Sequence, residues 1–352
     1  FLSKTFNSEI YLKKENLQLT GSFKLRGAFN RIANLDEKSK EKGVVAASAG
    51  NHAQGLAFAA NHFGIEATIF MPEATPLTKV SGVKSHGGKV VLIGENFDEP
   101  YSAAMKFKEE KGCEFIHPFA DDDVIAGQGT MAFELLDDVE NLKQIIVPIG
   151  GGGLISGIAI AIKAINPDIK IIGVVASGAR AMKESYKSQM AIDSKSVKTI
   201  ADGIAVKNVT PKMLDIIIDH VDDIVEVSDN EIANAILFLL EKEKLVVEGA
   251  GAVAVAAIMH EKVEIEDSRV CAVVSGGNID VTVLSQIIEK GLVKSSRKMN
   301  LIVTLMDKPG SLNHLTNVIK ESSANIVQID YDRNSVSLEF GEAHVTIALE
   351  TK

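Results

Sequence analysis

The segment at residues 20–27 places a lysine, Lys24, directly after an aromatic residue and between two glycines. A lysine amine is a nucleophile that can hold an aldehyde as a Schiff base. Taken alone, Lys24 is one lysine among many, and a solvated surface position is the commoner place for that residue type. Its chemistry therefore depends on what distant parts of the chain supply.

Four consecutive glycines form the second segment that could do chemistry. They follow a strand-like apolar run at residues 145–149 and precede a helix-like run of small residues: Gly150, Gly151, Gly152 and Gly153. Glycines between a strand and a helix let successive backbone N–H groups converge on an anion at the positive end of the helix. We expect a phosphate-binding loop, and a tight connection without a ligand is the alternative interpretation.

Two further segments carry polar groups that a cofactor and a small acid could use. One is a turn of backbone donors with an amide, ahead of a helix-like run: Ser48, Ala49, Gly50, Asn51 and His52. The other is Ser275 with the Gly-Gly-Asn that follows it, just after the apolar run at residues 270–274. A Schiff-base lysine, a phosphate loop and such polar groups are together what pyridoxal phosphate (PLP) needs.

With these pieces the sequence resembles the fold-type II PLP enzymes, which are tryptophan synthase beta-like, and within them the threonine and serine dehydratases. Seven segments match in the family's order, over roughly the first 295 residues: 22–28, 48–55, 126–130, 150–153, 201–203, 248–252 and 275–278. The resemblance implies an α/β fold of two open parallel-sheet domains. PLP is then expected in the crevice at the carboxyl ends of the strands.

The resemblance also implies a role for individual residues. Lys24 forms the Schiff base and returns as the base that removes the α-proton of the substrate. Phe23 lies against the pyridine ring, or is simply a core aromatic. The glycine loop binds the cofactor phosphate, and Asn51 binds the 3′-oxygen. The substrate carboxylate is held through the backbone of one turn, at Ser48, Ala49, Gly50, Asn51 and His52.

Ser275 decides the type of chemistry in this interpretation. It is expected to face the pyridine nitrogen, where a hydroxyl can leave the nitrogen neutral and an aspartate would keep it protonated. A neutral ring delocalises the substrate carbanion less, which favours loss of a β-leaving group over transamination. Glu248 lies near the ring in the family and is expected to tune protonation there. Capping of a helix is the alternative role for Glu248.

Two departures from relatives narrow the function further. Serine racemases of this family carry a second serine where this chain has Ala49, so racemisation should be slow. Relatives that bind a divalent ion use acidic residues in the segment that matches residues 176–182, which here holds Arg180 and no carboxylate. We therefore expect no metal ion at that position. The acidic run at residues 121–123 is expected to be solvated or to cap a helix.

Composition excludes several classes of partner. The 352 residues carry a net charge of −10, which argues against nucleic acid or an anionic membrane, since both need clustered Lys and Arg. Cys113 and Cys271 lie in apolar runs and indicate buried, reduced thiols in a cytoplasmic protein. Residues 145–162 carry no charge, but Pro148 and the glycines interrupt them, so we expect no membrane span.

Strands and helices alternate along most of the chain, which argues for parallel sheets covered on both faces. We predict strands at residues 9–12, 43–47, 67–71, 89–93, 113–117, 145–149, 171–175, 224–227 and 270–274, and helices at residues 51–62, 75–85, 97–111 and 124–138. Ser228 and Glu231 form a capping box before another helix. We assign residues 1–44 and 122–292 to a large PLP-binding domain, and residues 45–121 to a small α/β domain inserted into it.

The sequence changes character beyond residue 292. Residues 293–298 form a polar, basic linker, and residues 299–352 follow a β-α-β-β pattern with strands at 301–306, 326–331 and 336–340 (or on to 349) and a helix at 311–321. With Asp-Lys-Pro-Gly-Ser-Leu at its first turn, this part resembles the ACT domain, a ferredoxin-like α+β module that binds amino acids. The last helix and strand of that module are missing and the chain begins at Phe1, so we expect both ends to be truncated.

The resemblance implies threonine ammonia-lyase activity, in which L-threonine becomes 2-oxobutanoate and ammonia, with L-serine as a poorer substrate that gives pyruvate. The ACT-like part implies feedback control by an amino-acid effector such as isoleucine or valine. The family also implies a homo-oligomer, a dimer or a tetramer. Two alternatives stay open: a β-replacement enzyme of the cysteine synthase type, and an amino-acid sensor whose catalytic part is vestigial.

Overall fold

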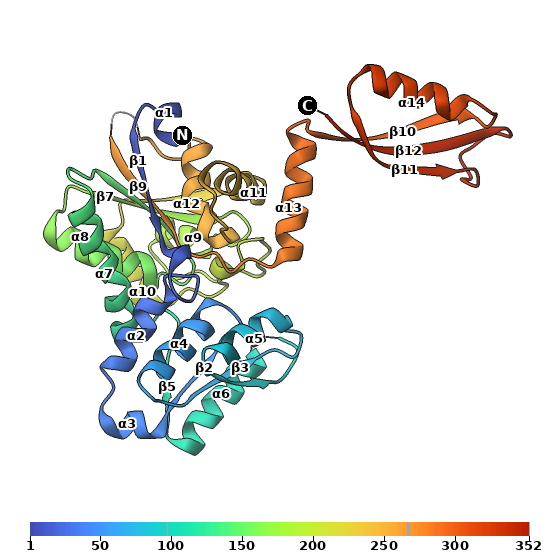
Figure 1. Ribbon diagram of the computed structural model, residues 1–352. Helices are drawn as coiled ribbons and strands as arrows, with labels where there is room; N and C mark the ends of the chain where they lie inside the picture. The colour runs from blue at the N-terminus through green and yellow to red at the C-terminus, as the bar shows by residue number, and fades with distance from the viewer. Residues whose placement is uncertain (97, 266–267, 352) are drawn as a thin grey trace. The chain divides into compact units, whose positions relative to one another are not determined.

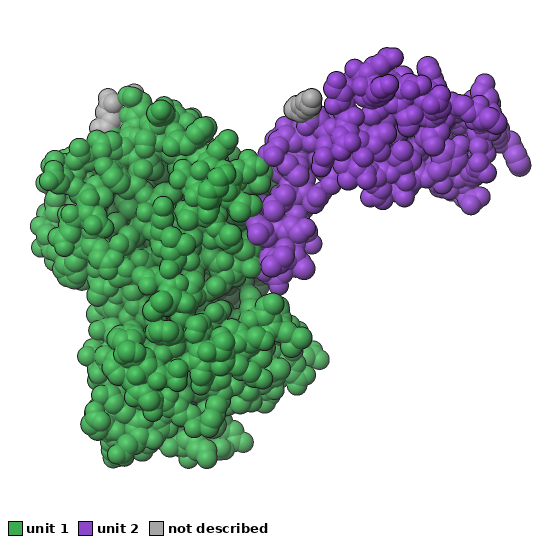
Figure 2. All heavy atoms as spheres, viewed as in Figure 1, with its two compact units in different colours: residues 1–279 green, residues 280–352 purple. Residues whose placement is uncertain are grey.

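The computed structural model of the chain describes residues 1–96, 98–265 and 268–351. The start of one predicted helix, Phe97, and the final residue of the predicted C-terminal domain, Lys352, lie outside the described residues. The chain forms two compact units, residues 1–279 and residues 280–352 (Figure 2).

The first unit contains a five-stranded parallel sheet in the order β1-β9-β6-β7-β8, in which β1 and β9 lie side by side (Figure 1). Its strands are β1 (Glu9–Lys14), β6 (Gln144–Pro148), β7 (Lys170–Ala176), β8 (Asp223–Val227) and β9 (Arg269–Val274). Its helices are α1 (Leu2–Thr5), η1 (Glu15–Leu17), α7 (Asp122–Asp138), α8 (Gly153–Ile165), α9 (Ala181–Ser188), η2 (Asp202–Ile204), α10 (Pro211–His220), α11 (Asp229–Phe238), η3 (Leu239–Glu243) and α12 (Gly249–Met259). We call these elements the large half. Strand β6 is buried along its whole length, as expected where both faces of a parallel sheet are covered.

A second parallel sheet of the same unit has four strands in the order β4-β3-β2-β5. The strands are β2 (Val44–Ala47), β3 (Ala67–Met71), β4 (Lys89–Leu92) and β5 (Glu114–Phe115), and the helices that alternate with them are α4 (Asn51–His62), α5 (Leu77–Ser85) and α6 (Asp98–Lys111). We call these elements the small half. Parallel strands that alternate with helices confirm the predicted α/β class, while the domain boundaries at 44/45 and 121/122 stay predictions. The strand expected at residues 113–117 is shorter, because β5 pairs with β2 at two positions alone.

Helix α2 (Lys24–Ala33) joins the two halves, since it packs against α4 of the small half and α7 of the large half; α3 (Glu37–Lys42) follows it. Arg26 in the first turn of α2 donates from Nε to Glu15 Oε2 at 2.8 Å and from Nη2 to Glu134 Oε2 at 2.7 Å. Glu15 is 2% exposed, so the guanidinium compensates a buried carboxylate. These bonds fix the start of α2, and Lys24 with it.

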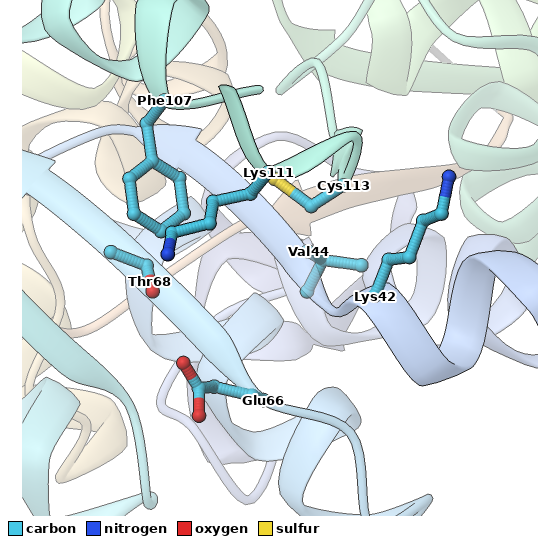
Figure 3. Close-up of a pocket in the computed structure, with 7 residues that line it drawn as sticks. All are labelled: Lys42, Val44, Glu66, Thr68, Phe107, Lys111 and Cys113. Atoms are coloured by element: carbon cyan, nitrogen blue, oxygen red, sulfur yellow. The ribbon is translucent and has the colours of Figure 1, made fainter. Parts of the chain in front are cut away.

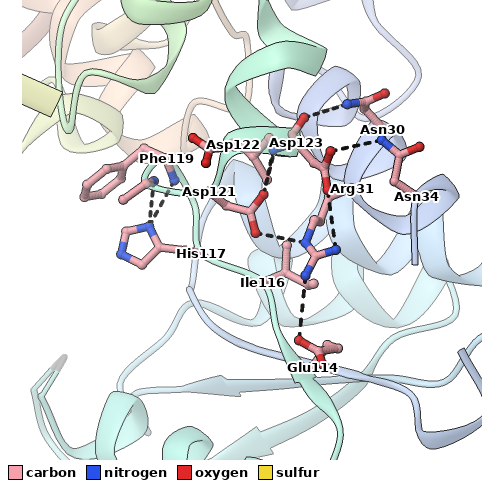
Figure 4. A network of polar contacts seen from close by, with 12 residues as sticks. Asn30, Arg31, Asn34, Glu114, Ile116, His117, Phe119, Asp121, Asp122 and Asp123 are labelled. Atoms are coloured by element: carbon pink, nitrogen blue, oxygen red, sulfur yellow. Dashed lines mark hydrogen bonds and ion pairs between the residues drawn. The ribbon is translucent and has the colours of Figure 1, made fainter. Parts of the chain in front are cut away.

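Two helix starts follow the sequence prediction. Ser228 and Glu231 exchange side-chain and backbone hydrogen bonds at the start of α11, which confirms the capping box. Asp121 caps α7, because its Oδ1 accepts from the backbone N–H of Asp123 at 3.0 Å. The other carboxylate oxygen of Asp121 accepts from Arg31 Nε at 2.9 Å (Figure 4). The capping interpretation of this acidic run is therefore confirmed for Asp121.

The uncharged stretch at residues 145–162 is divided between β6, the glycine loop and α8, as predicted. Within the described ranges, no helix combines the length and the apolar character that crossing a membrane requires. Cys271 lies in β9 and Cys113 directly precedes β5, and both thiols are buried and unpaired.

The second unit begins earlier than the sequence indicated. Helix α13 (Val281–Lys294) groups with residues 280–352, although the sequence predicts that its residues up to 292 belong to the large domain. It contacts β10 (Lys298–Met306), and Lys298 forms an ion pair with Glu289 of α13. The residues expected to form a linker, 293–298, are the end of α13, a turn and the first residue of β10. The helix buries Ile287 alone among its described residues.

The predicted β-α-β-β order is confirmed by β10, α14 (Ser311–Glu321), β11 (Asn325–Asp332) and β12 (Glu342–Glu350), whose antiparallel sheet has the order β10-β12-β11. A small core forms between α14 and the sheet, from Ile319, Val345, Ile347 and Leu349. The last predicted strand begins later than expected, because Val336 and Phe340 are fully exposed and β12 begins at Glu342. The shorter version at residues 336–340 is wrong, and the longer version, on to residue 349, overlaps β12. Its partner β10 ends opposite Glu342, at Met306, so the preceding residues have no strand to pair with there.

Candidate active site

Lys24 is the first residue of α2, and its amine is partly buried. Nζ donates to the backbone oxygen of Pro118 at 2.9 Å and lies 5.2 Å from the centroid of the Phe23 ring. Burial lowers the pKa of Lys24 to about 8, although the charge of Glu248 acts in the opposite direction. Near neutral pH, far more of this amine is uncharged than in an ordinary lysine, and the uncharged amine is the form that attacks an aldehyde.

The segments around Lys24 and Ser275 lie side by side. Ser22 forms an antiparallel bridge with Gly276, and the Phe23 N–H donates to the Ser275 carbonyl at 3.0 Å. Ser275 follows β9 and is 2% exposed, and its Oγ donates to the Ala250 carbonyl at 3.3 Å. The first and the last of the seven sequence segments thus meet at the same place.

A chain of polar side chains connects the small half to the large half beside this place. Asn51, at the start of α4, donates from Nδ2 to Glu248 Oε1 at 2.7 Å, and its Oδ1 accepts from Asn278 Nδ2 at 2.7 Å. Asn278 also donates to the Thr20 carbonyl at 2.8 Å. The sequence motif at residues 275–278 predicts no separate role for Asn278. The structure shows that it orients the amide of Asn51.

Glu248 is buried, at 5% exposure. Burial raises the pKa of Glu248 to about 7, and the charge of Asp202 adds to the effect. The residue occupies the N-cap position of α12, but its side chain accepts no hydrogen bond from the start of that helix among the described residues. The side chain is therefore directed to the amide of Asn51, and the helix-capping alternative does not describe it.

The four glycines connect β6 to α8, and Gly152 has a φ of +95°, in the left-handed region that glycine favours. A Cβ on Gly151 would lie 2.4 Å from Cδ1 of Phe119, and one on Gly150 would lie 2.9 Å from the Cα of Ile204. Close packing alone therefore requires glycine here, as the alternative interpretation of the sequence supposed. The same loop also precedes the N-terminus of a 13-residue helix, which is the arrangement that attracts a phosphate.

The turn at residues 48–52 connects β2 to α4. Ser48 Oγ accepts from the Gly50 N–H at 3.3 Å, and a Cβ on Gly50 would meet no atom within 4 Å. His52 is buried, its Nε2 lies 2.9 Å from the Ile116 carbonyl, and burial lowers the pKa of His52 to about 3. A neutral, already bonded imidazole cannot bind a carboxylate, so the backbone N–H groups are what this turn offers. Ala49 is partly buried against the core of the small half.

Residues 116–120 form a segment of the site that the sequence analysis missed. The Ile116 carbonyl holds His52, the Pro118 carbonyl holds Lys24, and the Phe119 ring covers the glycine loop. The segment is held by His117, whose Nδ1 accepts from the backbone N–H groups of Phe119 and Ala120 (Figure 4). It lies where the chain leaves the small half for the large half. That crossover position was the signal that could have identified it.

Gly151→Ala is expected to destabilise the loop by about 1–3 kcal/mol, the usual result of overpacking, because the new Cβ collides with Phe119. We also expect weaker PLP binding. Urea unfolding with and without PLP measures both effects. The matched control is Gly50→Ala, whose Cβ enters open space and should change the free energy of unfolding by less than about 0.5 kcal/mol. Equal effects of the two substitutions would show that contact with Phe119 does not constrain the loop.

A separate pocket of about 170 Å³ lies over the small half (Figure 3). It is lined by Lys42, Val44, Glu66, Thr68, Phe107, Lys111 and Cys113, none of which belongs to the segments described above. Burial raises the pKa of the Cys113 thiol, so the reactive thiolate is disfavoured.

The site therefore combines an amine of lowered pKa, a glycine loop at a helix N-terminus, a buried hydroxyl, an oriented amide and a buried carboxyl group. The buried Oγ of Ser22 has no hydrogen-bond partner among the described residues. A buried hydroxyl normally has such a partner, so a polar group of a ligand can fill this place. A nucleophilic amine, a glycine loop at a helix N-terminus and buried polar groups are the set that PLP needs, and the residues present fit that cofactor. Lys24 and Asn51 would hold its aldehyde side, and the glycine loop its phosphate.

Comparison with known proteins agrees with this arrangement. The family described as pyridoxal-phosphate dependent enzyme matches residues 1–276. An L-threonine ammonia-lyase of Thermotoga maritima is 48% identical over 350 residues, which are 99% of this chain and 87% of the relative. The processed form of threonine deaminase isoform 2 from Solanum lycopersicum has a TM-score of 0.78 at 38% identity and covers 82% of this chain and 84% of its own. Maize serine racemase has a TM-score of 0.78 at 37% identity, over 84% of this chain and 91% of its own. The chain belongs to the family of pyridoxal-phosphate dependent enzymes.

Proposed function

We propose that the chain is an L-threonine ammonia-lyase, which converts L-threonine to 2-oxobutanoate and ammonia. The observation that carries the proposal is the partly buried amine of Lys24, whose pKa of about 8 suits an amine that must exchange protons near neutral pH. The 48% identity to an L-threonine ammonia-lyase, over nearly the whole chain, supports the same substrate.

When bound, PLP supplies an aldehyde that takes up the amino group of the substrate and a ring that accepts the electron pair released at its α-carbon. Lys24 Nζ removes the α-proton, and its lowered pKa keeps part of the amine uncharged and able to accept that proton. The Pro118 carbonyl accepts a hydrogen bond from Nζ, and it can hold the amine in place once the amino group of the substrate has replaced it on the aldehyde. The β-hydroxyl takes up a proton and leaves as water, and addition of water to the unsaturated amine that remains gives 2-oxobutanoate and ammonia.

Ser275 is proposed to face the ring nitrogen. Its hydroxyl is buried and carries no charge to keep the nitrogen protonated. Its one hydrogen, which the Ala250 carbonyl accepts in this structure, can turn to the ring nitrogen. Glu248, with a pKa of about 7, can carry or release a proton near the ring at neutral pH. Asn51 donates to Glu248 with one hydrogen of its amide, which leaves the second for the cofactor oxygen.

The substrate carboxylate is proposed to bind the backbone N–H groups at residues 48–52, at the N-terminus of α4, where the helix dipole favours an anion. Ala49 presents a methyl group in this turn. A methyl group cannot return a proton to the face of the α-carbon opposite Lys24. We therefore propose elimination as the main reaction, rather than the racemisation named for maize serine racemase.

The decisive test is a product assay of the PLP-loaded enzyme with L-threonine and L-serine, read as keto acid and, by chiral chromatography, as D-amino acid. We expect 2-oxobutanoate as the main product, a slower release of pyruvate, and negligible D-serine. D-serine formed as fast as pyruvate would reassign the chain to a racemase. Absence of both keto acids, with PLP bound, would favour a β-replacement enzyme or an amino-acid sensor.

We further propose that residues 280–352 include an ACT-like unit that takes an amino-acid effector, with isoleucine or valine as the first candidates. The β-α-β-β order and the antiparallel sheet of this unit support the proposal.

We also propose a homo-oligomer, which the exposed Phe133 and Ile160 on the packed helices α7 and α8 support. A cytoplasmic location fits the net charge of −10 and the two free thiols. Addition of isoleucine to the product assay tests the effector directly.

A further inference from the structure

One sequence segment, Ala-Asp-Gly at residues 201–203, has no role in the proposed reaction. Its aspartate, Asp202, begins η2 in the large half, and its Oδ2 lies 2.9 Å from Nζ of Lys79. Lys79 belongs to α5 of the small half. The ion pair therefore connects the two halves of the first unit.

The large-half end of this ion pair lies directly beside the candidate site. A Cβ on Gly203 would be 3.4 Å from Glu248 Oε1, and Ile204 packs against Gly150 of the glycine loop. Turn η2 thus lies between the buried carboxyl group and the proposed phosphate loop. A shift of η2 therefore moves atoms that contact the Glu248 carboxyl group and the glycine loop.

The small-half end is coupled to the site through helix packing. Helix α5 packs against α4, where a Cβ on Gly82 would be 3.3 Å from the side chain of Gln54. Helix α4 begins with Asn51, which reaches across to Glu248. The Lys79–Asp202 pair and the Asn51–Glu248 bond are therefore two polar contacts between the same two halves, and each touches an element of the site.

We propose that Lys79 and Asp202 are positioning residues whose ion pair holds the small half against the large half over the bound substrate, and opens to exchange substrate and product. The inference rests on the proposed function of the site. The side chains of the pair are 27% and 64% exposed, and a pair of such exposure contributes little to stability. It can therefore break and form again during turnover, as a contact that closes a site must.

The pair also sets the charge around Glu248. The groups that face this carboxyl are Asp202 from η2, Lys79 from α5, Asn51 from α4 and the backbone of Asn278, and Lys24 of α2 interacts with its charge. Asp202 raises the pKa of Glu248 and Lys79 lowers it. Removal of one partner at a time therefore changes this pKa in opposite directions, whereas breaking the ion pair should raise KM in both single variants.

The test compares Lys79→Met, Asp202→Asn and the charge exchange Lys79→Asp/Asp202→Lys in the PLP-loaded enzyme. Each single variant should raise KM for L-threonine about three- to fivefold, the range of a partly exposed ion pair, with a smaller change in kcat. Both single variants should release PLP to a scavenging apoenzyme faster than the wild-type enzyme does. The charge exchange should restore KM and the rate of PLP release to their wild-type values. The acidic limb of the pH profile should move to higher pH in Lys79→Met and to lower pH in Asp202→Asn.

The matched control is Lys89→Met, which breaks an ion pair with Glu66 of 2.5 Å that lies within the small half. It should leave KM and PLP release unchanged. The inference is overturned if the wild-type enzyme forms keto acid and the single variants match the control, or if the charge exchange fails to restore KM and PLP release. If the wild-type enzyme forms no keto acid, the proposed function fails, and PLP release alone then decides whether the pair holds the two halves together.

Discussion

Lys24→Ala is expected to remove the visible absorbance of covalently held PLP and to lower turnover by at least about 10³-fold, or roughly 4 kcal/mol of transition-state stabilisation. Alanine has neither the amine that holds the cofactor nor the base that removes the α-proton. The loss should be near-complete because the nitrogen of Lys24 is fixed at 2.9 Å from the Pro118 carbonyl, a position that a free amine in solution does not share. Absorbance spectra and the keto-acid assay measure the two losses.

Two further variants separate chemistry from folding in this experiment. Lys24→Arg keeps the positive charge and much of the length, but a guanidinium stays protonated and forms no Schiff base, so it should be equally inactive. Lys143→Ala removes an exposed lysine just before β6 and should keep both absorbance and turnover. If Lys24→Ala retained its absorbance and its lyase rate, the central assignment of the site would be wrong.

Ser275→Asp is expected to slow elimination by about two to four orders of magnitude, or roughly 3–5 kcal/mol. The introduced carboxylate would keep the ring nitrogen protonated, and a protonated ring holds the released electron pair in place of passing it on to the β-leaving group. The position is 2% exposed, so the new charge is stable only if the ring nitrogen is its partner. Turnover of L-threonine and the free energy of unfolding with PLP bound are the measurements.

Ser275→Ala is the control for this substitution, because it removes the hydroxyl without adding a charge. It should reduce turnover by about tenfold, since a neutral ring needs no ion-pair partner and the loss is that of one hydrogen bond. An unchanged rate in Ser275→Asp would mean that this side chain does not contact the ring nitrogen. Equal unfolding free energies in the two variants would indicate that the carboxylate had found a charged partner.

Local sequence patterns predicted those elements that have clear boundaries in the chain. Helix α4 at residues 51–62 and helix α14 at residues 311–321 have the predicted bounds, because a glycine turn precedes each of them. Helix α12 was not predicted as an element, and ten of its residues are buried, so it has no polar face to mark a helical period. The last strand, predicted at residues 336–340 or on to 349, begins at Glu342, because β10 ends opposite that residue. Strand pairing of this kind cannot be read from the local sequence pattern.

The same distinction applies to the candidate site. Lys24, Asn51, the glycine loop and Ser275 were identified from the chemistry of their own segments, and the structure brings them together. Pro118, Phe119 and Asn278 act through a carbonyl, a ring packed on glycine and an amide that orients another amide. Such roles depend on partners that are distant in the chain, 94 positions for the Pro118–Lys24 bond and 227 for the Asn278–Asn51 bond. A single sequence gives no measure of those contacts.

Contact between the two ends of the first unit has a consequence for how the protein acquires activity during synthesis. Asn278 bonds to the Thr20 carbonyl 258 positions earlier in the chain. Closing a loop of that length costs on the order of 5 kcal/mol of chain entropy, which packing of both halves must first offset. Lys24 leaves the ribosome early, but its surroundings are incomplete until residues 275–278 have followed. Cofactor capture should therefore come late, and PLP fluorescence would report completion of the fold on a translating chain.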